Sequence, residues 1–353
     1  MKMHLQQIEI EGYRGIERLS LNLDQQINIF VGRNNTGKSS ILEAIMLAAT
    51  APNLYHDVLN NDLLQTIRDR LGSKSIKYLI NVNELSAEIK MRHERGSIDV
   101  IIVSSSKIKE LEKEILQRTN IGKMIQKYPE IKMSQKKEAI YFFTFIDEAP
   151  YQYYCGIDEE GEIFRKGKSF PSELIFMGYE AEPSLIELYD TLTRRGLIKK
   201  VIKNVREDIQ YFEDLRLAAT HELLVFLNWL EEPLPIELMG DGFKEMLRIA
   251  MLASVAEDKK VSILLEEPER HLHPGFMELV TDYIARVARE RKAQFFISTH
   301  SSELLESLID KATTVTKVFR MYREFDGRIT YEYFTGLEAK ELLAEIKEDL
   351  RGI

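Results

Sequence analysis

The sequence predicts an α/β fold in which a mixed sheet is flanked by helices and interrupted by an inserted α+β lobe. Three observations lead to this fold class. A buried strand expected at 27–31 runs into a glycine-rich loop at 32–39, and a helix is expected at 40–49. Two short apolar strands at 261–265 and 294–298 enclose a helix at 274–291. The long segment between these two halves mixes strand and helix patterns.

The composition is that of a globular protein. Of the 353 residues, 44% are hydrophobic and 30% are charged, which is enough for two or three lobes with a large core. No apolar run reaches the roughly 18 residues of a membrane span, and the start of the chain lacks a signal-peptide pattern. Cys155 is the only cysteine, so neither an internal disulfide nor a thiolate metal cluster can form. We expect a cytoplasmic protein with no membrane contact.

Three regions can be separated along the chain. Residues 1–50 hold two alternating strands, the buried strand, the loop and the helix. Residues 51–214 form the inserted lobe, with strands at 76–82, 87–92, 98–103, 139–147 and 151–156, a charged helix at 107–127, and one long basic helix at 183–208 that Gly196 relaxes. Residues 215–353 return to α/β character, with a hairpin turning at Asp326 and Gly327 and a final amphipathic helix at 337–350.

The loop after the first buried strand fits the phosphate-binding pattern G-x-x-x-x-G-K-[ST] in full. Glycines let the backbone turn tightly, so that successive N–H groups point at phosphate oxygens, and the lysine adds a positive charge. The hydroxyl after the lysine suits Mg²⁺. The alternative is a plain Gly/Asn turn before a helix. The strand, loop and helix context favours a site for ATP with Mg²⁺, formed by Gly32, Arg33, Asn34, Asn35, Thr36, Gly37, Lys38 and Ser39.

Two further strands end in residues that suit phosphate chemistry. The strand at 261–265 ends at Glu266 and Glu267, of which the first would sit beside Mg²⁺ and the second would polarise the attacking water. The strand at 294–298 runs into His300, whose imidazole can bond the γ-phosphate. The alternatives are an exposed acidic turn and a surface or capping histidine. The order of the motifs along the chain favours the catalytic interpretation, with Lys38, Glu267 and His300 in the catalytic set.

A second glycine motif precedes a helix rich in apolar residues. Two glycines at a helix N-terminus can bind an anion through backbone amides and the helix dipole. The alternative is a glycine turn with a cap. The motif residues are Met239, Gly240, Asp241, Gly242, Phe243 and Lys244.

These four elements, in this order, resemble the ABC-type ATPase head of the SMC/RecF-like group. The resemblance covers about 1–50 and 215–305, and leaves the middle region aside. The opening strand and turn also resemble this group, in the run Ile8-Glu9-Ile10-Glu11-Gly12-Tyr13-Arg14-Gly15. Within the group, the ATPase domain of OLD-family proteins and stand-alone prokaryotic defence ATPases resemble this chain most in motif style, in the run Glu266-Glu267-Pro268-Glu269-Arg270-His271-Leu272-His273-Pro274.

The resemblance implies roles for individual residues. Gly32 to Ser40 correspond to the Walker A loop, Glu266 to the Walker B acid that joins Ser39 at Mg²⁺, and Glu267 to the catalytic base. It further implies that the signature loop of one subunit closes on ATP held by another, giving a homodimer or a higher even oligomer. The remaining correspondences are the signature loop at Met239, Gly240, Asp241 and Gly242, the D-loop at His271 to His273, and the switch histidine at His300. Arg14 is a candidate nucleotide contact, with a surface role as the alternative.

The chain departs from the family pattern at several positions. Glu266 replaces the commoner Asp, and Met239 stands where a signature Ser is usual, so that a hydroxyl contact to the γ-phosphate is in doubt. The Q-loop glutamine is not placed, with Gln152 only a guess. The pair His271 and His273 lacks further ligands at metal spacing, which makes zinc a weak hypothesis.

The expected helix at 183–208 carries a basic stripe on an acidic protein of net charge −9. Such a stripe could follow a phosphate backbone. The alternative, a solvated face or a contact with an acidic partner, is favoured. The possible DNA contacts are Arg194, Arg195, Lys199, Lys200, Lys203 and Arg206.

The sequence and the resemblance together predict an ATPase that works as a nucleotide-driven switch in DNA-related or phage-defence machinery and controls a separate nuclease or effector. The alternatives are a repair or maintenance ATPase that binds DNA directly, and a nucleotide-binding scaffold with little turnover. Full-length OLD proteins append a TOPRIM nuclease domain. Only 53 residues follow His300, with no Asp-x-Asp pair, so we expect no TOPRIM domain. The run at 266–274 argues against a transporter subunit.

Overall fold

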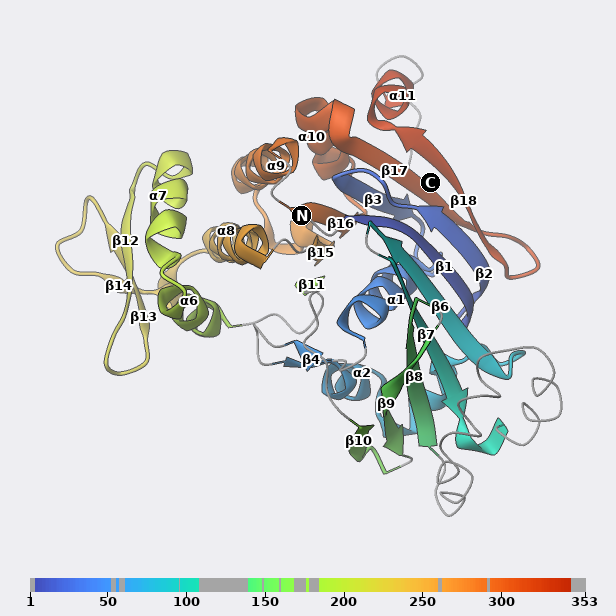
Figure 1. Ribbon diagram of the computed structural model, residues 1–353. Coiled ribbons are helices and arrows are strands. Elements are labelled where there is room, and N and C mark those ends of the chain that lie inside the picture. The colour runs from blue at the N-terminus through green and yellow to red at the C-terminus, as the bar shows by residue number, and fades with distance from the viewer. Residues whose placement is uncertain are drawn as a thin grey trace.

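Figure 1 shows the computed structural model of the protein, which describes residues 4–51, 55–56, 61–94, 96–107, 139–147, 149–158, 160–167, 176–177, 184–259, 262–290 and 293–343. Two large β-sheets enclose one helix between them, and further helices cover the outer face of one sheet. This arrangement of mixed sheets and flanking helices confirms the predicted fold class.

The first sheet carries the glycine-rich loop. Its six strands lie in the order β11-β15-β16-β3-β17-β18, and all neighbours are parallel except β17 and β18. Because β15, β16 and β3 are parallel neighbours, they end at one edge, and the loops that follow them meet there. The strands are β3 (Ile27–Gly32), β11 (Phe176–Met177), β15 (Ser262–Glu266), β16 (Gln294–Ser298), β17 (Thr316–Arg323) and β18 (Ile329–Thr335).

The second sheet is antiparallel, with seven strands in the order β10-β9-β8-β7-β6-β1-β2. Its strand β6 pairs directly with β1, so residue 50, where the inserted lobe was expected to begin, is no boundary of this sheet. Alternation in the sequence identifies strands but not their partners, which explains the difference. The strands are β1 (Leu5–Tyr13), β2 (Ile16–Asn22), β6 (Ser86–His93), β7 (Gly96–Ser104), β8 (Ala139–Ile146), β9 (Ala149–Asp158) and β10 (Ile163–Gly167).

Helix α1 (Lys38–Thr50) is the central element between the sheets. It contacts strands of both, and its apolar residues are buried all round, as expected for a helix that meets no solvent face. Side chains of β3 alternate between two cores. Phe30 faces α1, whereas Ile29 and Val31 face the helices on the outer side of the sheet. Those helices are α8 (Asp241–Lys259), α9 (Pro274–Arg289) and α10 (Ser302–Ala312).

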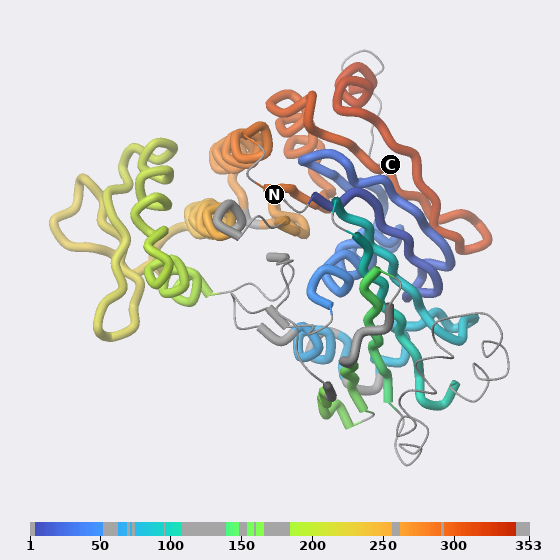
Figure 2. The backbone as a smooth tube through the Cα atoms, in the orientation of Figure 1, coloured from blue at the N-terminus to red at the C-terminus, as the bar shows by residue number. Residues whose placement is uncertain are grey.

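A smaller lobe packs on α8 and stands apart from the two sheets in Figure 2. The single helix expected at 183–208 is wrong. Gly196, with φ +71°, separates two helices, because glycine adopts this left-handed conformation at low cost and ends a helix there. The elements of the lobe are α6 (Leu185–Arg194), α7 (Ile198–Asp208), β12 (Phe212–Leu217), β13 (Leu223–Leu227) and β14 (Leu234–Pro235).

The strand expected at 76–82 is also wrong. This segment forms the 3₁₀ helix η1 (Ser73–Leu79), followed by one isolated bridge between Ile80 and Tyr13. The expected helix at 107–127 lies outside the described residues after 107, as does the expected C-terminal helix after 343. The remaining elements are β4 (Tyr55–His56), β5 (Asn61–Asp62), α2 (Leu63–Leu71), η2 (Ser105–Lys107), η3 (Ile236–Leu238), η4 (Pro268–His271), η5 (Thr313–Val315) and α11 (Gly336–Glu341).

None of the helices in the described ranges combines the length and the apolar character needed to cross a bilayer.

Candidate functional site

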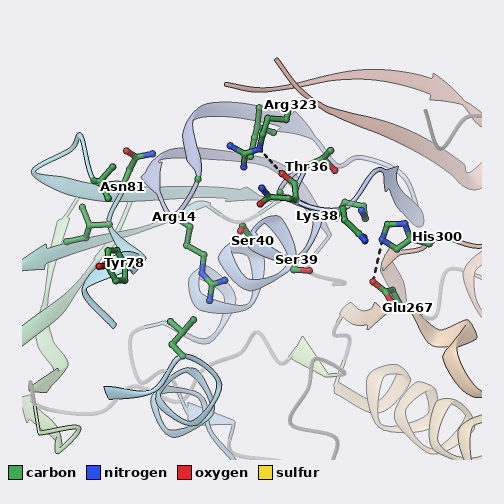
Figure 3. A pocket seen from close by; sticks show the side chains of 18 residues that line it. Arg14, Thr36, Lys38, Ser39, Ser40, Tyr78, Asn81, Glu267, His300 and Arg323 are labelled. Atoms are coloured by element: carbon green, nitrogen blue, oxygen red, sulfur yellow. Dashed lines mark hydrogen bonds and ion pairs between the residues drawn. The ribbon is translucent and has the colours of Figure 1, made fainter. Parts of the chain in front are cut away.

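A cavity of about 560 Å³ opens over the glycine-rich loop. Segments far apart in the sequence meet around it, as the close view in Figure 3 shows. They are the turn after β1, the loop between β3 and α1, the segment around η1, the loops after β15 and β16, and the β17–β18 hairpin. The lining residues are Arg14, Gly15, residues 34–40, Leu71, Tyr78, residues 80–82, Glu267, His300, Arg323 and Ile329.

The loop between β3 and α1 needs its glycines for close packing. Gly32 has φ +142°, and a Cβ there would lie 2.5 Å from the carbonyl oxygen of Met321 on β17. Gly37 has φ +91°, and a Cβ there would lie 2.7 Å from Ile329 on β18. Asn35 also adopts positive φ, at +64°. The hairpin therefore packs directly on the loop, and only residues without a side chain fit at these contacts.

Lys38 begins α1 and is buried with its ammonium folded back on the loop. Its Nζ donates hydrogen bonds of 2.8 Å to the carbonyl oxygens of Gly32 and Arg33. Burial lowers the pKa of Lys38 to about 8, although the nearby carboxylates of Glu267, Glu266 and Glu269 act in the opposite direction. Burial therefore disfavours the charged form of Lys38, and an anionic ligand in the cavity would stabilise that form.

Ser39 and Glu266 come together across the sheet edge. Ser39 lies in the first turn of α1 and Glu266 ends β15, and the hydroxyl of the former donates a hydrogen bond to Oε1 of the latter. A hydroxyl and a carboxylate beside a phosphate site are the oxygen donors that Mg²⁺ takes from a protein when it binds together with a nucleotide. The residues present therefore fit a Mg²⁺ ion bound together with a nucleotide.

Glu267 occupies a backbone conformation that is rare for this residue type. Its φ and ψ are 47° and 56°, and its N–H donates to the carbonyl oxygen of Ser298 at 2.8 Å. Its Oε1 lies 3.6 Å from Nε2 of His300, and its Oε2 lies 2.8 Å from Nε of Arg270. Strained conformations of this kind cluster at functional sites. The turn directs the Glu267 carboxylate into the cavity.

The loop that carries His300 is held by Glu269, a residue to which the sequence reading assigned no separate role. Glu269 Oε1 accepts three hydrogen bonds, from Thr299 Oγ1 at 2.7 Å, from His300 N at 2.9 Å and from Ser301 N at 3.2 Å. Burial and the charge of Lys38 lower the pKa of His300, so its ring is neutral at pH 7. The only sign of this role in the sequence is that Glu269 is the third acid in the run 266–269.

Arg14 enters the cavity beside the phosphate loop. It has φ +51°, and its Nη2 lies 2.7 Å from Oε2 of Glu43, which is fully buried on α1 and also accepts a hydrogen bond from the Tyr13 hydroxyl. In Figure 3, Arg14 lies between Tyr78 on one side and the serines of the loop on the other.

The second glycine motif lies elsewhere. Met239 to Gly242 are not among the described residues that line the cavity. Helix α8 begins at Asp241, within the motif that was expected to precede it, and Asp241 pairs with Lys244 at 2.6 Å. A Cβ on Gly242 would lie 2.8 Å from the Phe276 ring on α9, whereas a Cβ on Gly240 would meet nothing within 4 Å. Gly242 therefore permits the close packing of two helices, and Gly240 faces open space.

Other predicted residues fall outside the cavity. His273 caps α9 through Nδ1, which accepts the Gly275 N–H at 3.4 Å. The backbone of Gln152 lies in β9. The basic stripe lies on α6, α7 and the turn between them, and part of it is locally paired: Arg194 with Asp190 at 2.7 Å, Lys203 with Glu207 at 4.0 Å, and Arg206 with the Glu213 carbonyl oxygen.

The sequence reading missed three residues that shape the cavity. Tyr78 lies within η1 and Asn81 follows it, in a segment that matches no motif. Arg323, at the end of β17, donates from Nε to the Asn35 carbonyl oxygen at 2.8 Å and from Nη1 to the Gly327 carbonyl oxygen at 2.9 Å. Arg323 thereby links the hairpin to the phosphate loop. The two segments lie far apart in the sequence, so no local sequence pattern could predict this contact.

Several known proteins resemble this chain in sequence. A profile of the family described as "AAA ATPase domain" matches residues 3–165 and 177–305. The "ATP/GTP phosphatase" of Helicobacter pylori is 22% identical over 329 residues, which cover 86% of this chain and 87% of that protein. The "DNA replication and repair protein RecF" of Halothermothrix orenii is 22% identical over 224 residues, which cover 62% of this chain and 55% of that protein.

A solved structure has a similar fold. An SMC head, determined bound to the C-winged helix domain of ScpA, superposes with a TM-score of 0.54 at 14% identity and covers 95% of this chain and 99% of its own. The resemblance to OLD-family proteins stays a prediction. The family profile spans most of the chain, and the chain therefore belongs to the AAA ATPase domain family, with the fold of an SMC head.

Proposed function

We propose that the protein binds ATP with Mg²⁺ in this cavity and hydrolyses it to ADP and phosphate. The observation that carries the proposal is that Lys38, Glu267 and His300, from three separate parts of the sequence, line one cavity. The relative described as an "ATP/GTP phosphatase" supports hydrolysis.

Binding falls to the phosphate loop. The N–H groups at the start of α1 would donate to the phosphates, and the helix dipole adds to their effect. Lys38 would exchange its two carbonyl partners for phosphate oxygens. Ser39 and Glu266 would hold the metal, whose contribution is to neutralise charge on the phosphates. Arg14, Asn34, Asn35, Thr36 and Ser40 complete the nucleotide contacts that we propose.

Glu267 is the residue that we propose to polarise the attacking water. Its carboxylate lies at the cavity, beside the Lys38 charge that would meet the phosphates. His300 is neutral at pH 7 and can donate one hydrogen bond to a phosphate oxygen while its ring stays near Glu267. Glu269 acts through the His300 loop and is a positioning residue.

We further propose that the site is completed by a second copy of the chain. Met239 to Gly242 lie outside the cavity lining of their own chain, and Gly240 faces open space. A helix N-terminus of this kind would reach the nucleotide of another subunit. The turnover per subunit should then rise with protein concentration and reach a plateau. A rate per subunit that stays constant from nanomolar to micromolar protein, with the protein monomeric throughout, would contradict this part of the proposal.

We propose that ATP hydrolysis drives a conformational change of this protein, and that this change controls another protein. The name of the RecF relative, a DNA replication and repair protein, supports a DNA-related setting. The SMC head was solved with a partner domain bound. The effector, the role in phage defence and direct DNA contact are parts of this proposal.

The DNA contact can be tested separately. Lys199 and Lys203 lie on the exposed side of α7, and Lys203 has an acidic neighbour in Glu207. Reversing both charges should weaken salt-sensitive DNA binding. Binding that is unchanged and insensitive to salt would remove α7 from any DNA interface.

A further inference from the structure

The cavity has two chemically different ends. One end holds the phosphate loop, Lys38, Glu267 and His300. The other, which lies beyond Arg14 in Figure 3, is formed by the segment around η1 and is mainly apolar: Leu71, Tyr78, Ile80, Asn81 and Val82. If a triphosphate occupies the first end, the rest of the nucleotide would extend into the second.

Apolar side chains at the second end are unusually exposed. The Tyr78 side chain is 54% exposed and Val82 is 73% exposed. The ammonium of Lys77 lies 5.4 Å from the centre of the Tyr78 ring. An aromatic ring left open beside a phosphate site offers a flat surface of the size of a nucleobase, since aromatic rings and bases stack through their faces.

The backbone groups and the side-chain oxygen of Asn81 at this end are already engaged within the protein. Asn81 donates its N–H to the Gly12 carbonyl oxygen at 2.8 Å, and its own carbonyl oxygen accepts from Glu84 N at 3.0 Å. Its side-chain oxygen accepts from Asn83 N at 3.0 Å. The side-chain oxygen that could accept a hydrogen bond from the amino group of a base is therefore held in a turn.

We propose that this end of the cavity is a nucleobase subsite in which Tyr78 and Val82 contact the face of a purine, so that the site accepts ATP and GTP with similar affinity. The proposal rests on the nucleotide binding proposed above and adds the substrate class. Adenine and guanine differ at the hydrogen-bonding edge, where one carries an amino donor and the other a carbonyl acceptor. Their faces are alike. A site that contacts faces through apolar groups discriminates weakly between such ligands, whereas a site built to hydrogen-bond an edge discriminates by several orders of magnitude.

The test is calorimetric titration of the full-length protein with ATP, GTP and inorganic tripolyphosphate, all in the presence of Mg²⁺. The Kd values of ATP and GTP should agree within about fivefold. Tyr78→Ala should weaken both nucleotides by about tenfold, the loss typical when the aromatic partner of a stacked base becomes alanine, and should leave tripolyphosphate unchanged. Tyr78→Phe should keep wild-type affinity, because the ring face is retained. Tyr211→Ala, a similarly exposed tyrosine on the small lobe, is the matched control.

Each contrary result has a distinct meaning. A GTP affinity more than about fiftyfold below that of ATP, or an unchanged nucleotide affinity in Tyr78→Ala, overturns the subsite while nucleotide binding stands. An equal loss for tripolyphosphate assigns Tyr78 to the structure of the site and also overturns it. If the wild-type protein binds neither nucleotide nor tripolyphosphate, the proposed function itself fails, and the subsite with it.

Discussion

Glu269 holds the backbone of His300: its Oε1 atom accepts the His300 N–H at 2.9 Å. The same oxygen accepts the Thr299 hydroxyl at 2.7 Å. Glu269, in η4 just after β15, therefore fixes the loop after the neighbouring strand β16. The Glu267 carboxylate and the His300 ring, 3.6 Å apart, are placed from the same short turn.

This relationship predicts a positioning role for Glu269. Glu269→Ala removes the common acceptor, so the His300 loop loses its anchor, and kcat for ATP hydrolysis should fall by about 10- to 100-fold with a KM changed less than about threefold. Glu269→Gln keeps an acceptor oxygen and should recover most of kcat. The pair is compared by steady-state ATPase kinetics, with thermal unfolding as a check of folding. An equal loss in both variants, or a loss in KM alone, would argue against positioning.

Lys38 predicts a pH dependence of nucleotide affinity. Its pKa in the free protein is about 8 because it is buried, and a bound triphosphate favours the charged form. Below pH 8 the lysine is charged in both states, so the affinity should be flat. Above pH 8 binding must take up a proton, and Kd should rise by up to about tenfold per pH unit.

The pH experiment needs a control that cannot lose its charge. Kd is measured by titration calorimetry between pH 7 and 9.5, a range in which phosphate ionisation changes little above about pH 7. Lys38→Arg should bind more weakly but show no slope between pH 8 and 9.5, because guanidinium stays protonated. The same slope in both proteins would assign the proton to another group.

Gly242 predicts a packing effect on stability. A side chain at this position meets the Phe276 ring, with Cβ at 2.8 Å. Gly242→Ser should therefore lower the free energy of unfolding by about 1–3 kcal/mol, the usual cost of overpacking. Gly240→Ser, two residues earlier, places the same atoms in open space at a favourable capping position and should change it by less than about 0.5 kcal/mol. Denaturant unfolding without nucleotide compares them, and equal losses would refute the packing argument.

Much of the site was predictable because its chemistry is local in sequence. A lysine and hydroxyl after a glycine-rich loop, and carboxylates or a histidine after apolar strands, identify themselves by pattern and order. The structure brings Lys38, Glu267 and His300 to one cavity for a simple reason: β3, β16 and β15 are parallel neighbours whose ends share one edge.

The rest depends on contacts between distant segments, which periodicity does not encode. The pairing of β6 with β1 joins segments on both sides of residue 50 in one sheet. Arg323 reaches Asn35 across a hairpin packing that only the folded chain reveals. In the segment at 76–82, the alternating apolar residues Ile76 and Ile80 predicted a strand, but most of it coils into η1 and leaves Tyr78 at the cavity.

The most direct test of the account is the rate of ATP hydrolysis by Glu267→Gln. The amide keeps the size of the side chain but cannot polarise water, so the rate should fall at least 100-fold while the Kd for ATP with Mg²⁺ changes by less than about threefold. Glu303→Gln, an exposed acid on α10 near the same loop, is the control and should match the wild type. Turnover by Glu267→Gln equal to that of the wild-type protein would contradict the assignment of Glu267 and, with it, the proposed mechanism.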